Sequence, residues 1–481
     1  MSRKDGLFRL IKSLTTVEKR FFLQMASKNK SESNYITLFR AIERQELYDE
    51  AAIKAAFKDK KFVTQLHVTK INLTELILKS LKTFNARNSA NASILELLRE
   101  IELLFVKELY DLCFQRLHRA LHLAEKFEKF PLHMELLAWH RKLIAATASV
   151  NLPGVSDILR QEKGLIGKIS NLNSFWSESM RAYDSTAAEN EFTTKDICQI
   201  EKADSVQSKI LHHHFLFTRF YIAGKLEDAN LEVSKLIAML EQSAARIEDD
   251  PTSYITAIMN KVVLLLSFKR WNELPPLLLK VSGIINSSRF QNESQLTVRL
   301  WVRLYNVELE MYRDTKDLEK GMRLIGVIQS YIQARKAAIT ADYLIMFYFQ
   351  FASIFFLAKD FSKSLKWINE IINTNFGSIR LDIQKYTRIL NLMVHFELGN
   401  TSLLQYATDS SKRFLKKNKI LFPAEELLLQ LFSKLDQLQI EMHSVIFKNS
   451  LAAWQSLDHA KRTQIEDYVD ISAWLKENLI Q

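Results

Sequence analysis

The sequence predicts an all-α protein, and three observations lead to that prediction. The 481 residues include only ten glycines and six prolines, where average usage would give about 34 and 24. Strand-rich folds need frequent turns built from these residues, whereas long helices do not. The stretch Tyr343–Ala358 runs without a charge and is followed by the amphipathic run SKSLKWINEII. A spacing of apolar residues that is typical of helices then recurs along the chain.

Residues 1–90 are predicted to form a basic helical domain. They carry 18 lysines and arginines against 9 acids, whereas the remaining residues carry 48 against 46, so most of the net charge of +11 lies here. Thr15-Thr16-Val17-Glu18 has the form of a capping box, which predicts that a helix begins there. Further helices are expected from Tyr35 to about Leu47, over the run EAAIKAAF, and from Phe62 to Phe84.

Five lysines around the junction of the last two helices raise the alternative of a nucleic-acid contact. A helix-turn-helix would place its second helix in a groove of DNA, and concentrated positive charge supplies non-specific affinity for phosphates. Two features favour a packing helix whose lysines face solvent or an acidic protein partner: the long helix is strongly apolar, and acids such as Asp49 and Asp59 alternate with the lysines. The candidate residues are Lys54, Lys58, Lys60, Lys61 and Lys70.

Residues 91–422 are predicted to form a series of helical hairpins. Each hairpin has an apolar anchor just after a turn, a small or apolar residue three positions later, and aliphatic residues at seven and ten positions. Phe361, Ser364, Ile368 and Ile371 show the pattern. Further anchors are Tyr110, Leu226, Trp271 and Leu318. From Leu226 onwards the anchors are 45, 47 and 43 residues apart, and a period in this range is typical of stacked hairpins.

These hairpins resemble tetratricopeptide-type repeats. The matching features are Ala352 and Phe355 before the turn, then Phe361 and the small Ser364 after it. The resemblance implies a right-handed α-α superhelical solenoid with helical caps at both ends, the C-terminal cap being residues 423–481. First helices of such arrays line a concave surface that binds a partner. The partner-binding residues implied are His214, Thr218, Tyr221, Arg303, Asn306, Glu310 and Arg313.

The uncharged stretch Tyr343–Ala358 has two interpretations. A membrane span needs about 20 apolar residues, and this stretch is shorter, with Gln350 in its middle and charged residues at both ends. A helix that is apolar on every side can also be buried among other helices. The turn and amphipathic helix that follow favour burial within the hairpin series, so no contact with a membrane is predicted.

No cofactor, metal or catalytic group is predicted. The histidine clusters are the run His212-His213-His214 and the pair His118 and His122. The pair has the i, i+4 spacing at which both rings could reach one metal ion, but the sequence has no His-Glu-x-x-His motif, so ordinary helix histidines are favoured. Gly164-Leu165-Ile166-Gly167-Lys168 superficially resembles a phosphate loop, although it follows a helical stretch and lacks the spacing of a P-loop. Asn151-Leu152-Pro153-Gly154 is expected to be a loop.

The sequence therefore favours a non-enzymatic scaffold that binds a peptide or protein partner on the concave face of a helical array. The alternative is a DNA-binding regulator with a basic head and a repeat sensor. Two isolated cysteines exclude a disulfide framework, and the N-terminal residues lack the apolar run of a secretory signal. A cytoplasmic location is expected from both. The partner and the oligomeric state are not specified by the sequence.

Overall fold

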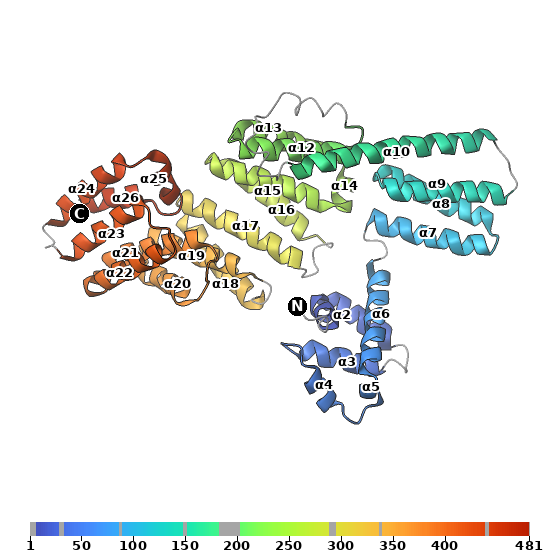
Figure 1. Ribbon diagram of the computed structural model, residues 1–481, viewed down its shortest axis with the longest axis horizontal. Coiled ribbons are helices and arrows are strands. Elements are labelled where there is room, and N and C mark those ends of the chain that lie inside the picture. The colour runs from blue at the N-terminus through green and yellow to red at the C-terminus, as the bar shows by residue number, and fades with distance from the viewer. Residues whose placement is uncertain are drawn as a thin grey trace. The chain divides into compact units, whose positions relative to one another are not determined.

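The computed structural model describes residues 6–27, 33–85, 89–147, 152–181, 203–287, 295–335, 339–437 and 442–480, and within these ranges the regular secondary structure is entirely helical (Figure 1). The prediction of an all-α protein is confirmed. The chain divides into two compact units, Met1–Ser294 and Gln295–Gln481. The predicted boundaries at residues 90 and 422 stay predictions.

The first unit begins with a group of short helices around a small apolar core. These are α1 (Gly6–Ser13), α2 (Thr16–Ser27), α3 (Ser33–Arg44), α4 (Glu50–Ala56), α5 (Lys61–Thr64) and α6 (Leu66–Asn85). The predicted capping box is present, because the Thr15 N–H donates to Glu18 Oε2 at 2.9 Å and the Glu18 N–H donates to Thr15 Oγ1 at 3.1 Å. Leu73 and Ile77 on α6 are fully buried against this core, so α6 is a packing helix.

The rest of the first unit consists of longer helices that pack against their neighbours in the chain. They are α7 (Ala90–Val106), α8 (Tyr110–Lys126), α9 (Phe130–Ala146), α10 (Leu152–Arg181), α12 (Val206–Ile222), α13 (Leu226–Glu241), α14 (Ala244–Asp249), α15 (Pro251–Ser267), the 3-10 helix η5 (Trp271–Glu273) and α16 (Leu274–Ile285). α7 packs on α8, α8 on α9, and α12 on α13.

α10 corrects two interpretations of the sequence. The loop expected at residues 151–154 is wrong from Leu152 onwards, since α10 begins there, and Asn151 lies outside the described residues. Pro153 is tolerated because the first turn of a helix needs no N–H donor at that position. Gly164 and Gly167 lie inside the same helix, which excludes a phosphate loop.

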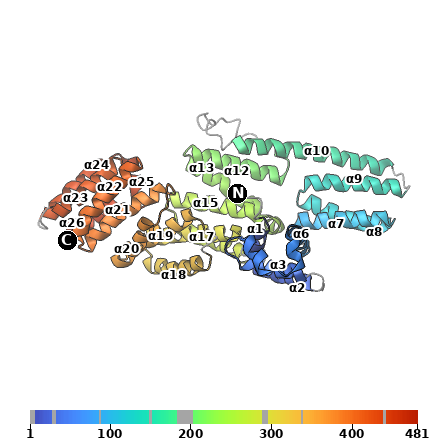
Figure 2. The same cartoon turned by 60° about the horizontal axis from the view of Figure 1, so that its bottom comes forward.

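The second unit is a series of antiparallel helices. They are α17 (Gln295–Asp314), α18 (Leu318–Arg335), α19 (Ala341–Leu357), α20 (Phe361–Asn373), α21 (Leu381–Glu397), α22 (Thr401–Lys417), α23 (Pro423–Gln437), α24 (His443–Ser456), α25 (His459–Glu466) and α26 (Ile471–Ile480). The first helices of successive pairs, α17, α19, α21 and α23, contact one another in chain order. Near the C-terminus, α24 lies beside both α23 and α26 (Figures 1 and 2).

The small residue after each anchor lies where the two helices of a pair approach closely. Ser364 Oγ donates to the Ala352 carbonyl at 2.8 Å. Cys113 occupies the same place in its pair, and its thiol donates to the Ile101 carbonyl at 3.6 Å. A Cβ on Gly321 would lie 3.5 Å from Tyr312 Cβ of α17, the first helix of its pair, and 3.2 Å from Ile354 Cδ1 of α19 in the next pair. The aliphatic residues predicted at seven and ten positions after the anchors are buried in every pair: Leu117, Ala120, Val233, Leu236, Leu278, Val281, Ile325, Ile328, Ile368 and Ile371.

A left-handed residue marks most of the turns within these pairs. Gly224 and Gly399 have φ of 71° and 67°, and Lys269 and Lys359 adopt φ of 57° and 58° without being glycine. The N–H after each of these four residues donates to the carbonyl five positions earlier, as in a Schellman motif. The turns are therefore alike although glycine appears in only some of them.

α19 contains most of the uncharged stretch, and its side chains are buried on all sides. Phe347 and Phe351 are 0% exposed and belong to one apolar cluster, whereas Phe349 is 1% exposed and belongs to another. Among the described helices, none has both the length and the apolar character that a membrane crossing requires.

Candidate functional site

The predicted contact residues on α17 differ in accessibility. Helical spacing places Arg303, Asn306, Glu310 and Arg313 on one stripe of the helix. Arg303 is exposed at one end. Asn306 is buried, and its Nδ2 donates to the Val302 carbonyl of its own helix at 2.9 Å. Arg313, at the other end, is only 7% exposed. A partner can therefore reach one end of this stripe, whereas the chain itself covers the other.

The chain segment that covers Arg313 is the link between α25 and α26. The Arg313 guanidinium donates to Asp314 Oδ1 at 2.6 Å, to Gln350 Oε1 at 3.3 Å and to the main-chain carbonyl of Asp467 at 3.2 Å. Residues from α17, α19 and the α25–α26 link thus meet at one side chain. The carbonyl contact recognises the main chain and does not depend on the side chain of Asp467.

Tyr468, the next residue of the link, is surrounded by aromatic rings. It stacks on Tyr386 of α21 with ring centroids 4.3 Å apart, and it packs edge-to-face with Phe349 of α19 with ring centroids 6.0 Å apart. The Arg380 guanidinium interacts with Tyr468 and also forms a two-pronged ion pair with Asp382, with bonds of 2.6 to 3.2 Å. We call Arg313, Phe349, Arg380 and Tyr386 the tyrosine pocket.

The ionisable groups around the tyrosine pocket are partly desolvated. Burial raises the pKa of Glu310; the nearby Arg313 lowers it, and Asp314 and Asp467 raise it further. Burial is also the largest cause of the raised pKa of Tyr468. Charges in such a site interact more strongly than they would in water. A charged group that enters this site would therefore be attracted or repelled more strongly than it would be in water.

A buried ion pair lies next to the tyrosine pocket. Lys385 Nζ is 2.6 Å from Glu425 Oε1, and the two side chains are 9% and 3% exposed. The Lys385 ammonium also lies 4.8 Å from the centre of the Tyr386 ring. Glu425 Oε2 accepts the Phe422 N–H at 3.1 Å, at the start of α23. This pair joins α21 to α23 beside the Tyr386 ring.

The predicted contact residues of the first unit lie on α12. Tyr221 is 40% exposed and stacks on Phe217. Thr218 Oγ1 donates to the His214 carbonyl of its own helix at 2.8 Å. Burial is the first cause of the lowered pKa of His214, and His213 adds to it. Of these residues, Tyr221 offers the most surface to a partner.

The histidine clusters do not form a metal centre in the part of the chain that the structure describes. His213 Nδ1 lies 2.8 Å from Glu232 Oε2, so this histidine already has a partner. Both ring nitrogens of the fully buried His212 lack a hydrogen bond, and burial lowers its pKa to about 4. His118 packs against the rings of Phe114 and His140.

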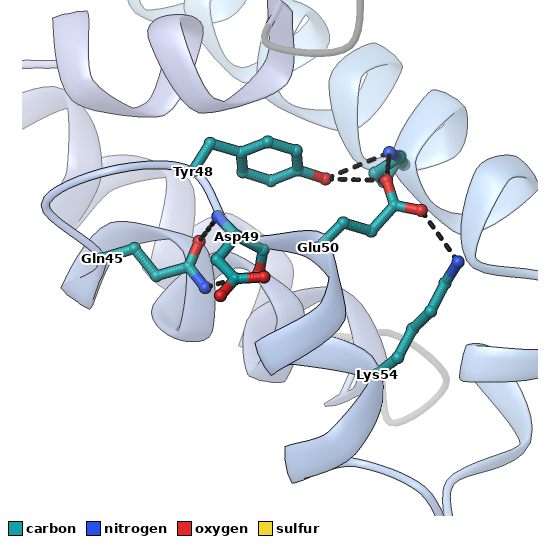
Figure 3. A network of polar contacts seen from close by, with 6 residues as sticks. Gln45, Tyr48, Asp49, Glu50 and Lys54 are labelled. Carbon is teal, nitrogen blue, oxygen red and sulfur yellow. Dashed lines mark hydrogen bonds and ion pairs between the residues drawn. The ribbon is translucent and has the colours of Figure 1, made fainter.

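Two of the five candidate nucleic-acid contacts are already paired within the first unit. Glu50 lies 2.6 Å from Lys70 Nζ and 3.0 Å from Lys54 Nζ, and the Tyr48 hydroxyl joins the network (Figure 3). The hydrogen bond from Lys70 is the main cause of the low pKa of Glu50, about 2. Asp49 caps α4 through the Ala52 N–H. The acids near the lysines therefore neutralise part of the charge that DNA would need.

The remaining candidates differ in what the structure describes. Lys58 and Lys60 are exposed between α4 and α5 and have no ion pair among the described residues. The side chain of Lys61 lies outside the described residues. Two exposed lysines on one short link make a small basic surface, and α6 turns its apolar face inward. The nucleic-acid contact stays a prediction.

Sequence reasoning missed the tyrosine pocket. Asp467 is 154 residues from Arg313 along the chain, and no local pattern links them. Arg380 and Asp382 are close in sequence, but nothing in their spacing indicates that Tyr468 lies beside them. Helical spacing placed Arg313 on one stripe with Arg303, but that spacing does not indicate that the chain's own α25–α26 link covers Arg313.

Searches of protein-family models, of curated proteins and of solved structures gave no match for this chain. A function for the chain is therefore argued from the chemistry of its own residues.

Proposed function

We propose that this protein is a non-enzymatic scaffold that binds a peptide or protein partner on the face formed by α17, α19 and α21. One observation carries the proposal. This face already holds an irregular piece of polypeptide, the link Asp467–Asp470, through a carbonyl contact and an aromatic stack. A surface that binds one such segment has the chemistry to bind another.

The arrangement of the second unit supports a tetratricopeptide-like array as the architecture behind this function. α17, α19, α21 and α23 contact one another in order, and each of the first three is followed by a second helix that packs on it. One hairpin cannot bury its own apolar face, so stacking of neighbours stabilises each pair. In a right-handed superhelical solenoid built this way, the first helices would form the inner, partner-binding surface.

The exposed end of the α17 stripe offers a further contact for the partner. Arg299 and Arg303 are exposed there, one turn apart, and continue the line that leads to Arg313. A guanidinium forms two parallel hydrogen bonds with a carboxylate. The partner segment is therefore expected to carry acidic groups where it crosses the N-terminal half of α17.

Charge reversal at Arg303 tests the proposal. The full chain and an Arg303→Glu variant would each be used to capture partners, which are quantified by mass spectrometry and then titrated in purified form. We expect Arg303→Glu to weaken binding by about tenfold or more, as for loss of a charge-assisted contact. Arg323→Glu, at an exposed arginine of α18 outside the stripe, is the matched control. Equal binding by wild type and Arg303→Glu would contradict the proposed surface.

A further inference from the structure

The link between α25 and α26 is fixed at its ends and less buried at its tip. Ile465 and Ile471 are 1% and 0% exposed, and Val469 is 5% exposed. These three side chains belong to the large apolar cluster of the second unit. By contrast, Asp467 is exposed and Tyr468 only partly buried. The Tyr468 and Val469 N–H groups both donate to the Ile465 carbonyl at 2.9 Å, so departure of the tip costs these backbone bonds while Ile465 and Ile471 stay anchored in the cluster.

Beyond its backbone bonds to Ile465, the tip makes contacts that another chain could reproduce. Arg313 donates to a main-chain carbonyl, which every residue has. Tyr386 stacks on the Tyr468 ring and Phe349 packs edge-to-face with it, and such arrangements favour any aromatic side chain. Arg380 interacts with Tyr468 as well. Together these groups select a tyrosine that follows an accessible carbonyl.

We infer that the tyrosine pocket is the specificity site for the partner, and that Tyr468 is an internal copy of the partner's own tyrosine. This inference rests on the proposed function and names its ligand: a segment that presents, in a turn, a tyrosine after an accessible main-chain carbonyl.

An internal occupant lowers the apparent affinity for the partner. A tethered group competes at an effective concentration that is high for a short link, and the partner binds only the fraction of molecules in which the tip has left. Removing the Tyr468 ring would vacate the pocket and strengthen binding. Removing the Tyr386 ring would weaken it, because the stacking surface is lost.

A labelled peptide with the sequence of residues 463–472, TQIEDYVDIS, is the probe. It would be titrated by fluorescence anisotropy against the full chain as wild type, Tyr468→Ala and Tyr468→Ala/Tyr386→Leu. We expect Tyr468→Ala to bind the peptide at least tenfold tighter than wild type and the double variant to lose that gain. A peptide with alanine in place of its tyrosine is expected not to bind.

Folding and function are separated by two further measurements. Tyr468→Leu keeps an apolar side chain at the tip, and it replaces Tyr468→Ala if circular dichroism shows that the alanine variant has lost helix. Equal peptide affinity for wild type and the folded vacated variant would overturn the inference. If Arg303→Glu still releases a captured partner in that case, the scaffold proposal stands and only the tyrosine site is removed. If the peptide affinities are equal and Arg303→Glu also leaves partner binding unchanged, both the tyrosine site and the scaffold proposal are wrong.

Discussion

Breaking the buried ion pair between Lys385 and Glu425 should destabilise the second unit strongly, whereas replacing both residues should not. Their charges lie 2.6 Å apart with side chains 9% and 3% exposed. Lys385→Met leaves the carboxylate buried with one hydrogen bond, from the Phe422 N–H. An unpaired buried charge costs about 3–5 kcal/mol. The free energy of unfolding should fall by that amount.

The double variant Lys385→Met/Glu425→Leu removes both charges and keeps similar volumes. Apolar replacement of a buried pair is often neutral or stabilising. The Phe422 N–H would lose its acceptor, at a cost of about 1–3 kcal/mol. We therefore expect the double variant to be less destabilised than Lys385→Met alone, with a coupling free energy of roughly 2 kcal/mol or more.

Urea unfolding followed by circular dichroism would measure these free energies, with the urea dependence checked for a single transition. The exposed pair of Lys320 and Asp317, with side chains 57% and 35% exposed, is the control. Lys320→Met should cost at most about 0.5 kcal/mol. A cost below about 1 kcal/mol for Lys385→Met would refute the reasoning, since it would mean that water reaches the carboxylate.

Four further outcomes are expected. Phe351→Asp should unfold the second unit, because an unpaired charge at a fully buried position costs several kcal/mol; a helical, monodisperse variant on gel filtration would contradict this. Lys269→Gly should raise the free energy of unfolding by about 0.5–1 kcal/mol, because φ of 57° strains any residue with a Cβ, whereas Lys163→Gly, inside α10, should lower it by about 1 kcal/mol. His212 has a folded-state pKa of about 4 against about 6.5 in the unfolded chain. Neutral His212 therefore contributes fully to the free energy of unfolding above about pH 6.5. As the pH falls from there towards 4, this contribution is lost, by up to about 3 kcal/mol. The difference in unfolding free energy between pH 7.5 and 5 should be smaller in His212→Leu, and an unchanged difference would exclude this histidine as the cause. The full chain should not retard duplex DNA in a gel at low salt, since Lys54 and Lys70 are paired with Glu50; a shift that disappears as salt rises would restore the nucleic-acid alternative.

Local signals predicted the helices well. The Thr15–Glu18 capping box begins α2 as expected, and Ser364 lies at the close approach of α19 and α20. Both depend on residues within a few positions or on one helical face. The prediction for the start of α10 was wrong because Pro153 and Gly154 were interpreted as a turn. A proline is tolerated in the first turn of a helix, because the N–H that it lacks would have no acceptor within the helix.

Long-range contacts could not be predicted, because they depend on which surfaces meet. Glu128 accepts the N–H groups of Val206 and Gln207 at 3.0 and 3.1 Å, and so caps α12 from the turn between α8 and α9. Asp249 likewise accepts the Ala90 N–H at the start of α7, at 2.7 Å. Each acid stabilises a helix terminus far away in sequence, and its own neighbours in the chain give no indication of it.

The α17 stripe shows why a face can be predicted before its role. Arg303 and Arg313 lie on the same side of α17, about three turns apart, so helical periodicity does not distinguish them. The structure separates them: Arg303 is exposed, whereas Arg313 binds the chain's own Asp467 carbonyl. A residue that binds polypeptide within its own chain contributes to stability, and the same residue with that segment displaced would contribute to recognition. The two roles differ only in which tyrosine, Tyr468 or one from a partner, lies against Tyr386.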